Sequence, residues 1–462
     1  MLMRILDRLP EGTVAVGGGL VVNGLAAYTF ITLASRDLGA EAYTPVGLLW
    51  ALSFLLGPGF FQPLEQETAR VIAGRPANGL RSVIRPAAIL GGSLALALAV
   101  VAVVAAPWIV DSLFAGQGIL FVALLLVLVG LGTGHLVRGV LAGLGHFGGY
   151  ARYFIGDGIG RLLLVGIGSL VLTDDVAVYG LAVGGAPFLG VAAALTGQRS
   201  AARGSEASQP EPGIVAPGRR SELAALAPAM GFLLVASVST AIVLNVSPLA
   251  VELLAGPTQR EEAGRFLNAL LIARVPLFFF QAVQASLLPK LSSLAADGHL
   301  EEFRQVLGRL LALVAALGVV AVAACAVAGH LVVEMAFGAE FAVGRRDMVL
   351  LAASSAVLMI VLSLAQALIA QRCQGRMALA WLAGLCAFPV VLAFGGDLFL
   401  RVELALLATV VTAMVAMAVL LARRRCQPAR AGPRQNICSR DLPEWRQAAW
   451  EMRPGRRPYS RQ

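Results

Sequence analysis

Two arginines lie inside long apolar stretches of the chain, where a charge requires an explanation. Arg274 is followed by Pro276, and Gln281 and Gln284 lie further along the same stretch. An arginine at the centre of a bilayer costs about 2.5–3.5 kcal/mol on insertion scales. Because its forked guanidinium suits bidentate binding of a phosphate, we interpret Arg274 as a candidate phosphate-binding residue in a water-filled cavity. The alternative is that it extends outward along the helix or pairs with a neighbouring helix.

Arg161 occupies another apolar stretch, and Asp157 precedes it by four residues. On a helix these two side chains lie on the same face, one turn apart. An ion pair within the helix is therefore the simpler interpretation of Arg161, with a substrate contact as the alternative.

Two carboxylates, Glu65 and Glu67, follow Pro63 at the end of a further apolar stretch. They are candidates for a gate or for proton coupling. Arg70 and Arg75 come shortly afterwards, so the alternative is a pair of solvated carboxylates that form ion pairs with these arginines.

Two asparagines, Asn23 and Asn245, fall at similar depths in two other apolar stretches. Buried amides in membranes more often join helices than bind substrate, with gains near about 0.6 kcal/mol. Both interpretations stay open for these two residues.

No group of residues in the sequence predicts catalysis or a metal site. Ser/His/Asp sets and His/Glu clusters with suitable spacing are absent, and the five cysteines lack metal-ligand spacing. The glycines Gly156, Gly158 and Gly160 lie within an apolar stretch and do not follow a strand, so they do not form a nucleotide-binding loop. We therefore expect no enzymatic activity, no cofactor and no metal.

The composition excludes a soluble globular protein. Of 462 residues, 58% are hydrophobic and 14% charged, and the mean hydropathy is +0.80. Apolar stretches of about 20 residues can cross a bilayer, and backbone groups in lipid must be satisfied within a helix. We predict an all-α polytopic membrane protein with about twelve transmembrane helices. The predicted spans are about 13–35, 44–62, 86–110, 118–137, 153–173, 176–197, 223–247, 266–288, 308–333, 348–370, 378–397 and 402–422.

Basic residues gather in the loops on the side of the N-terminus, even when residues 423–462 are left aside. By the positive-inside rule, we expect a multi-pass protein of the bacterial cytoplasmic membrane with both termini in the cytoplasm. This orientation, and attraction to anionic membrane lipids, explain the net charge of +9, so no nucleic-acid partner is expected.

A polar segment at 198–222 divides the predicted spans six and six. Since it is rich in Ser, Pro, Gly and Arg, we expect a cytoplasmic linker between an N-terminal six-helix lobe (1–197) and a C-terminal six-helix lobe (223–422). Each half begins and ends on the same side, so the two lobes are parallel repeats. Residues 423–462 predict a basic cytoplasmic tail that is disordered for most of its length.

One sequence pattern occurs twice, at the cytoplasmic ends of the second and eighth predicted spans. The first copy covers 57–70 and contains Pro63, and the looser second copy covers 279–295 and contains Pro289. We interpret both prolines, and the carboxylates after the first, as gate or hinge candidates. The repetition favours a transporter built from two related halves.

The arrangement of spans, with a proline after the second and the eighth, resembles the MOP (multidrug/oligosaccharidyl-lipid/polysaccharide) exporter superfamily. Within it, segments 38–43 (Leu-Gly-Ala-Glu-Ala-Tyr) and 61–70 (Phe-Gln-Pro-Leu-Glu-Gln-Glu-Thr-Ala-Arg) are similar to polysaccharide-biosynthesis flippases of the Wzx type. The glycine that follows the first segment in those proteins is Thr44 here. The resemblance covers about 1–422 and excludes the tail.

This resemblance implies a central cavity between the two lobes, lined by spans one, two, seven and eight. It implies transport of a lipid-linked oligosaccharide, a polysaccharide precursor of the polyprenyl-pyrophosphate type, by alternating access. The implied partners are this lipid-linked glycan, membrane lipids and, as a further class, polysaccharide-assembly proteins. The polar residues of the chain on those spans become the substrate-binding candidates: Arg274, Gln281, Gln284, Asn23, Asn245 and Gln62.

Three other functions stay open. A cation-coupled drug exporter of the same superfamily would need a deep acidic residue in the N-terminal half, where Asp157 is the candidate. A membrane glycan ligase or glycosyltransferase would need a sizeable outer loop, and the predicted outer loops are short. The third is an envelope-assembly scaffold without catalytic activity.

Overall fold

The computed structural model describes residues 13–73, 80–172, 175–196, 219–256, 261–277, 299–371 and 373–422, together with positions 259, 280, 291 and 294. Every regular element in this part of the chain is a helix. The predicted all-α fold is therefore confirmed.

The N-terminal elements are α2 (Thr13–Leu56), η1 (Gly57–Phe61), α3 (Gln62–Ala73), α4 (Leu80–Val104), α5 (Ala106–Ser112), α6 (Gly118–Gly143), α7 (Phe147–Val171) and α8 (Asp175–Leu195). The C-terminal elements are α10 (Arg219–Leu254), α11 (Glu262–Ala273), α13 (Leu300–Ala324), η3 (Cys325–Gly329), α14 (His330–Phe337), η4 (Ala339–Phe341), α15 (Arg345–Ala370), α16 (Gln374–Leu392) and α17 (Leu398–Ala422).

Ten helical stretches in the described residues are long and apolar enough to cross a membrane. One of them, Val14–Ala73, contains two of the predicted spans. The predicted span 266–288 lies partly outside the described residues. The ten stretches therefore agree with a multi-pass protein of about twelve predicted spans.

Helix α2 breaks at Gly39, between the first two predicted spans. Its φ of 70° and ψ of 172° lie in a region that is essentially restricted to glycine. A side chain here would also meet Glu340, because a Cβ atom would lie 3.1 Å from its Oε2. We call the end of the molecule that contains this break the Gly39 end.

The helix is irregular again at η1, a π-helix that contains Pro58. Proline lacks the N–H that a regular helix needs, so it disturbs the hydrogen-bond ladder at this point. The chain then continues as helix through Pro63, which is buried in α3.

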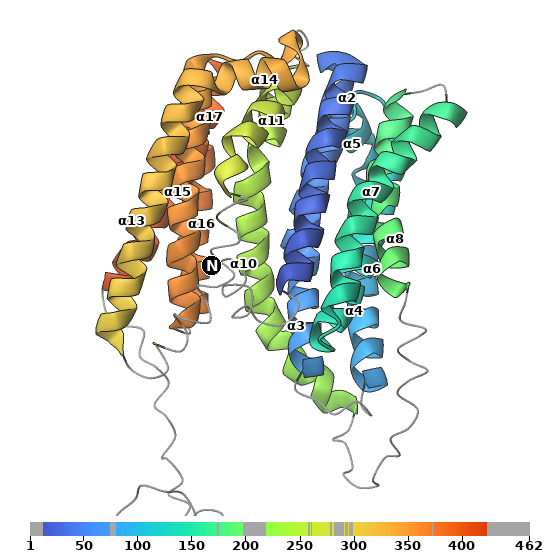
Figure 1. Cartoon of the computed structure of the whole chain (residues 1–462), viewed down its shortest axis with the longest axis vertical. Coiled ribbons are helices and arrows are strands. Elements are labelled where there is room, and N and C mark those ends of the chain that lie inside the picture. The colour runs from blue at the N-terminus through green and yellow to red at the C-terminus, as the bar shows by residue number, and fades with distance from the viewer. Residues whose placement is uncertain are drawn as a thin grey trace, which may run out of the picture.

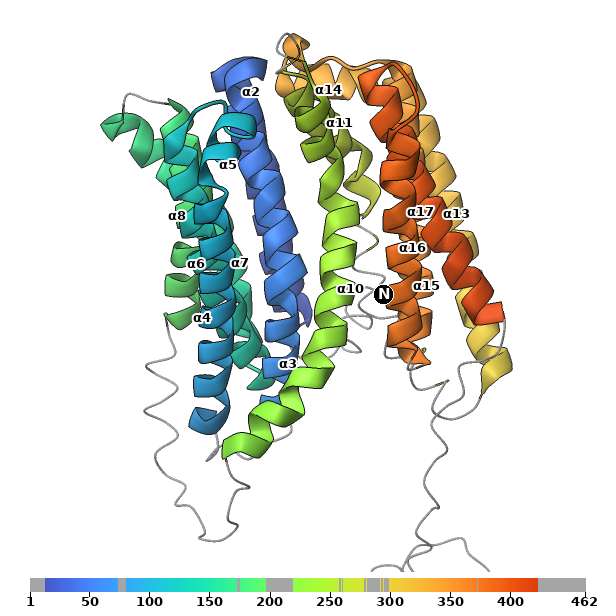
Figure 2. The same ribbon diagram turned by 180° about the vertical axis from the view of Figure 1, so that it is seen from behind.

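Two helix groups stand side by side (Figures 1 and 2). The N-terminal group contains α2 to α8, and the C-terminal group contains α11 to α17. Helix α10 contacts α2, η1 and α3 on one side and α16 and α17 on the other. In both views the ribbons of the two groups lie closest at the Gly39 end, at the top.

The buried apolar side chains explain this shape. At the Gly39 end, one cluster joins both groups, with Phe30 from α2, Phe266 from α11 and Phe337 from α14. Further along, separate clusters form around Trp381 in the C-terminal group and Tyr153 in the N-terminal group. Among the residues that the structure describes, the two groups therefore share a core at the Gly39 end and have separate cores further along.

Candidate functional site

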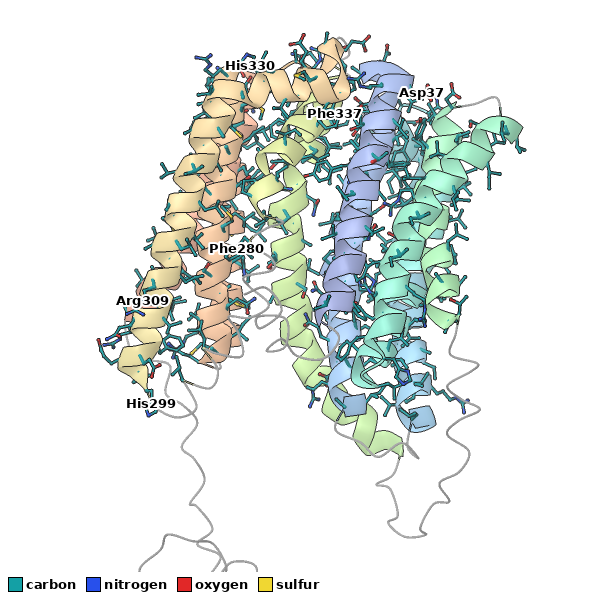
Figure 3. All side chains as sticks on the ribbon, viewed as in Figure 1. Asp37, Phe280, His299, Arg309, His330 and Phe337 are labelled. Carbon is teal, nitrogen blue, oxygen red and sulfur yellow. The ribbon has the colours of Figure 1, made fainter. Side chains whose placement is uncertain are left out.

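Arg36 of α2 reaches across to the C-terminal group. Its Nε donates a hydrogen bond of 2.8 Å to the carbonyl of Ala336, and a terminal guanidinium nitrogen donates to the carbonyl of Met335. Both carbonyls belong to the last turn of α14, where the helix dipole attracts a cation. Figure 3 labels Asp37, which follows Arg36 in the sequence, and Phe337, which follows Ala336. Both lie at the Gly39 end.

Glu340 of η4 makes a reciprocal contact with α2. Its Oε2 accepts a hydrogen bond of 3.0 Å from the N–H of Ala40. The break at Gly39 leaves the next N–H groups without helical partners, so they need other acceptors. The carboxylate therefore caps the second half of α2 from the opposite group.

A buried hydrogen bond lies deeper along the same helices. The Tyr43 hydroxyl donates to Oδ1 of Asn268 on α11 at 2.7 Å, and both side chains are buried. Together these contacts define the Gly39 interface. Its members are Arg36, Ala40 and Tyr43 on α2, and Asn268, Met335, Ala336 and Glu340 on the C-terminal group.

Arg274 caps the C-terminus of α11, the helix that also carries Asn268 of the Gly39 interface. Its N–H donates to the carbonyl of Leu270 at 3.1 Å. Among the described residues, its side-chain Nε has no hydrogen-bond partner. Tyr28 of α2 lies close enough to act on the guanidinium electrostatically, and its hydroxyl donates to the carbonyl of Leu271 at 3.1 Å. Arg274 therefore lies between the two groups with an unused donor.

Of the predicted polar positions, the structure places two in contacts between or within helices. Asn23 packs against α7, because a Cβ atom on Gly158 would lie 2.9 Å from its Oδ1. Asn245 donates to the carbonyl of Ala241 at 3.0 Å within α10. Gln62 is exposed at the start of α3. The structure does not bring these three residues together with Arg274 in one hydrogen-bonded site.

Three predicted residues lie outside the described residues: Gln281, Gln284 and Pro289. Their roles as binding or hinge residues stay predictions.

The predicted ion pair within α7 is confirmed. Arg161 and Asp157 are 2.8 Å apart, and both are buried. The guanidinium carbon lies 4.8 Å from the centre of the Trp50 ring. Since the charge is paired and also faces an aromatic ring, Arg161 is accounted for without a substrate.

Glu65 has a partner that the sequence did not indicate. Its carboxylate lies 2.5 Å from Arg138 of α6 and accepts a hydrogen bond of 2.6 Å from the Tyr150 hydroxyl of α7. Arg138 also faces the ring of Tyr153, 5.0 Å from its centre. The alternative interpretation of Glu65 as a solvated carboxylate is therefore wrong, because the side chain is buried and its partners here are Arg138 and Tyr150. Arg75, the other partner considered, lies outside the described residues. This cluster joins α3, α6 and α7.

Glu67 does pair with Arg70, at 2.8 Å between Oε2 and Nε. The arginine is exposed, whereas Glu67 is buried and not solvated as expected. Pro63 lies one turn earlier in the same helix.

A pocket of about 380 Å³ opens at the Gly39 end beside α2, α5 and the end of α10. Acidic residues Glu41, Asp111 and Glu252 contribute to its lining. Of the residues predicted to bind substrate, none that the structure describes lines this pocket.

The comparisons with known proteins concern most of the chain. No protein-family model matches the sequence. Uncharacterized proteins of Mycobacterium bovis and Mycobacterium tuberculosis are 25% identical over 347 residues, which is 72% of this chain and 74% of theirs.

Solved structures of MATE transporters share the fold. An inward-facing multidrug resistance MATE family transporter of the MOP superfamily aligns with a TM-score of 0.67 at 14% identity, over 90% of this chain and 98% of that one. An outward-facing multidrug resistance MATE family transporter of the MOP superfamily aligns with a TM-score of 0.55 at 15% identity, over 90% of this chain and 95% of that one. A Vibrio cholerae MATE transporter mutant gives 0.60 at 15% identity, over 90% and 97%. The chain therefore has the fold of these transporters.

Proposed function

We propose that this chain is a transporter of the MOP superfamily that carries a lipid-linked oligosaccharide across the cytoplasmic membrane by alternating access. Sugars and a pyrophosphate cannot cross hydrocarbon unaided, because their polar groups would lose their hydrogen bonds to water. Two helix groups that rock against each other would expose the cargo first to one side and then to the other.

The observation that carries this proposal is the unequal joining of the two helix groups. They share one apolar core and the Gly39 interface at one end, whereas their cores are separate further along. The alignment with the inward-facing MATE structure, at a TM-score of 0.67, supports the same conformation. The distribution of basic residues predicts that the Gly39 end faces outward. The conformation is then the one that accepts cargo from the cytoplasm.

Arg274 is the residue that we propose for the head group. It lies between the groups, and its Nε has no partner among the described residues. A guanidinium in a low-dielectric site binds a phosphate more strongly than one in bulk water. The segment that follows it supplies Gln281 and Gln284 as further candidates.

The test uses purified protein in vesicles that contain a polyprenyl-pyrophosphate oligosaccharide. Transport exposes sugar to a membrane-impermeant glycosidase on the outside, so cleavage above that of protein-free vesicles is the expected result. We expect Arg274→Ala to abolish this signal and Arg274→Lys to keep a part of it. The matched control is Arg345→Ala, an exposed arginine at the start of α15, which should keep full activity. Normal transport by Arg274→Ala would exclude the proposed role of Arg274.

A cation-coupled drug exporter is the second candidate, favoured by the multidrug transporter among the structural neighbours. In the same vesicles, it predicts movement of a cationic dye that depends on a proton or sodium gradient. Dye movement without exposure of sugar would replace the first proposal with the second.

A further inference from the structure

Glu403 of α17 is a carboxyl group to which the transport proposal assigns no role. Its side chain is 0% exposed. Neither carboxyl oxygen has a hydrogen-bond partner among the described residues. An isolated carboxylate that is sealed from water is very costly, and such a group takes up a proton instead.

The charged neighbours of Glu403 make the ionised form still less favourable. Asp347 of α15 and Asp397, which precedes α17, are carboxylates that act on it electrostatically, and Arg346 of α15 opposes them in part. The N–H of Leu400 donates to Asp397 at 2.9 Å and holds the pKa of Asp397 below its usual range. A negative charge therefore persists beside Glu403 at neutral pH.

The cation nearest to these groups is already engaged. Arg346 lies 2.8 Å from Asp347 and 3.5 Å from Asp397. On α17 itself, Arg401 donates to the carbonyl of Leu392 at 2.8 Å. Neither arginine forms an ion pair with Glu403 in the described structure.

Helix α11 brings both acids and a base to this end, because Arg265 forms ion pairs with Glu261 at 2.6 Å and with Glu262 at 3.7 Å. Glu262 lies within electrostatic range of Asp347 and Asp397, and Glu252 lies near the end of α10. Helix α16 carries Arg376 at its opposite end. The charged groups that act on Glu403 are therefore two acids and one arginine that lies close to both of them. The site is also dry, so burial and the two acids favour the protonated form.

A contact between α17 and α11 connects the helix that carries Glu403 with the Gly39 interface. Phe399 lies one turn before Glu403 on α17, and its ring packs edge-on against Phe266 of α11, 5.4 Å between centres. Asn268, two residues after Phe266, accepts the hydrogen bond from Tyr43. Helix α11 thus contacts both α17, one turn from Glu403, and the opposite helix group.

We propose that Glu403 is a proton-binding site: it holds a proton while the Gly39 interface is closed, and it releases the proton when this interface opens and water reaches the carboxyl group. The binding of the proton follows from the burial of Glu403. The release step rests on the alternating access proposed above.

The proton is tested by infrared spectroscopy of the full chain in lipid nanodiscs at neutral pH. We expect the carbonyl band of a protonated carboxylic acid, shifted by isotope labelling of glutamate and lost in Glu403→Gln. The matched control is Glu334→Gln, an exposed carboxyl of α14, which should leave the band unchanged. If the band survives in Glu403→Gln, the site is excluded.

A second variant and a measurement on the wild type complete this test. Should Glu403→Gln fail to fold, Glu403→Leu removes the acid without adding a polar group, and it should abolish the same band. In the wild type, the absence of a glutamate-dependent band at neutral pH would exclude the proposal without any variant. No transport substrate is present, so failure here is distinguishable from failure of the transport proposal.

The release step is tested with spin labels at Asp111→Cys and Glu334→Cys, two exposed positions on opposite groups at the Gly39 end, in a background without the native cysteines. At low pH the carboxyl is neutral, so the short distance of the closed interface should dominate. As pH rises, a longer distance should appear in the wild type and be absent in Glu403→Gln. The same pH response in both proteins would overturn the proposed coupling.

Discussion

The Tyr43 hydroxyl donates a hydrogen bond of 2.7 Å to Asn268 across the two helix groups, at a point where both side chains are buried. The Tyr43 ring also packs edge-on against Phe341, 5.4 Å between centres. While the interface is closed, burial shields this bond from competing water and strengthens it, so the contact favours one closed arrangement. A hydrogen bond requires a defined geometry, whereas apolar contacts are non-directional. The Tyr43–Asn268 bond is therefore more specific to the closed state than the apolar contacts around it.

Tyr43→Phe tests this hydrogen bond while keeping the ring. The Asn268 amide oxygen is left without its partner, so we expect the closed state to lose about 1–3 kcal/mol relative to the open state. The spin-label pair at positions 111 and 334 measures this loss as a larger fraction of the long distance. Tyr150→Phe is the control, because it removes a buried tyrosine hydroxyl from the Glu65 cluster and leaves the Gly39 interface intact. Equal distance distributions in wild type and Tyr43→Phe would contradict the role of this bond.

Gly39→Ala tests the break in α2. Its backbone conformation is nearly restricted to glycine, so an alanine there costs about 1–3 kcal/mol. The new methyl group also crowds the Glu340 carboxylate. We expect a lower unfolding temperature in detergent and a larger open fraction at the Gly39 end. Gly24→Ala, inside the same helix and with open space around it, should be neutral or stabilising by up to about 1 kcal/mol. A stable, closed Gly39→Ala protein would show that the break is not required.

The predictable parts of the structure are those that depend on local sequence. Apolar stretches in a bilayer have to be helical, so composition alone predicts the fold class. The Asp157–Arg161 pair is equally predictable from the sequence, because a separation of four residues places both side chains on one helix face. The break at Gly39 lies between the predicted spans 13–35 and 44–62, where the local sequence already predicts that one span ends and the next begins.

The contacts across the molecule were not predictable in this way. Glu65 and Arg138 are 73 residues apart, and Tyr43 and Asn268 are 225 apart. No periodicity in one sequence relates such positions, because the packing of separate helices decides which faces meet. Tyr43 did fall in the segment that resembles a known family, but its partner carried no sequence signal. Arg36, Glu340 and Glu403 were missed for the same reason.

Arg138→Met tests the buried cluster at the end of the N-terminal group away from Gly39. Methionine keeps the apolar contacts with the Tyr153 ring but removes the charge that Glu65 faces, and breaking a buried pair costs about 3–5 kcal/mol. The double variant Glu65→Gln/Arg138→Met removes both charges of this pair, so it should lose less than the sum of the single variants, with a coupling of about 0.5–3 kcal/mol. Unfolding in detergent mixtures measures all three. Arg304→Ala removes an exposed ion pair with Glu301 and should change stability by at most about 1 kcal/mol. Strictly additive losses would mean that Glu65 and Arg138 stabilise the fold independently of each other.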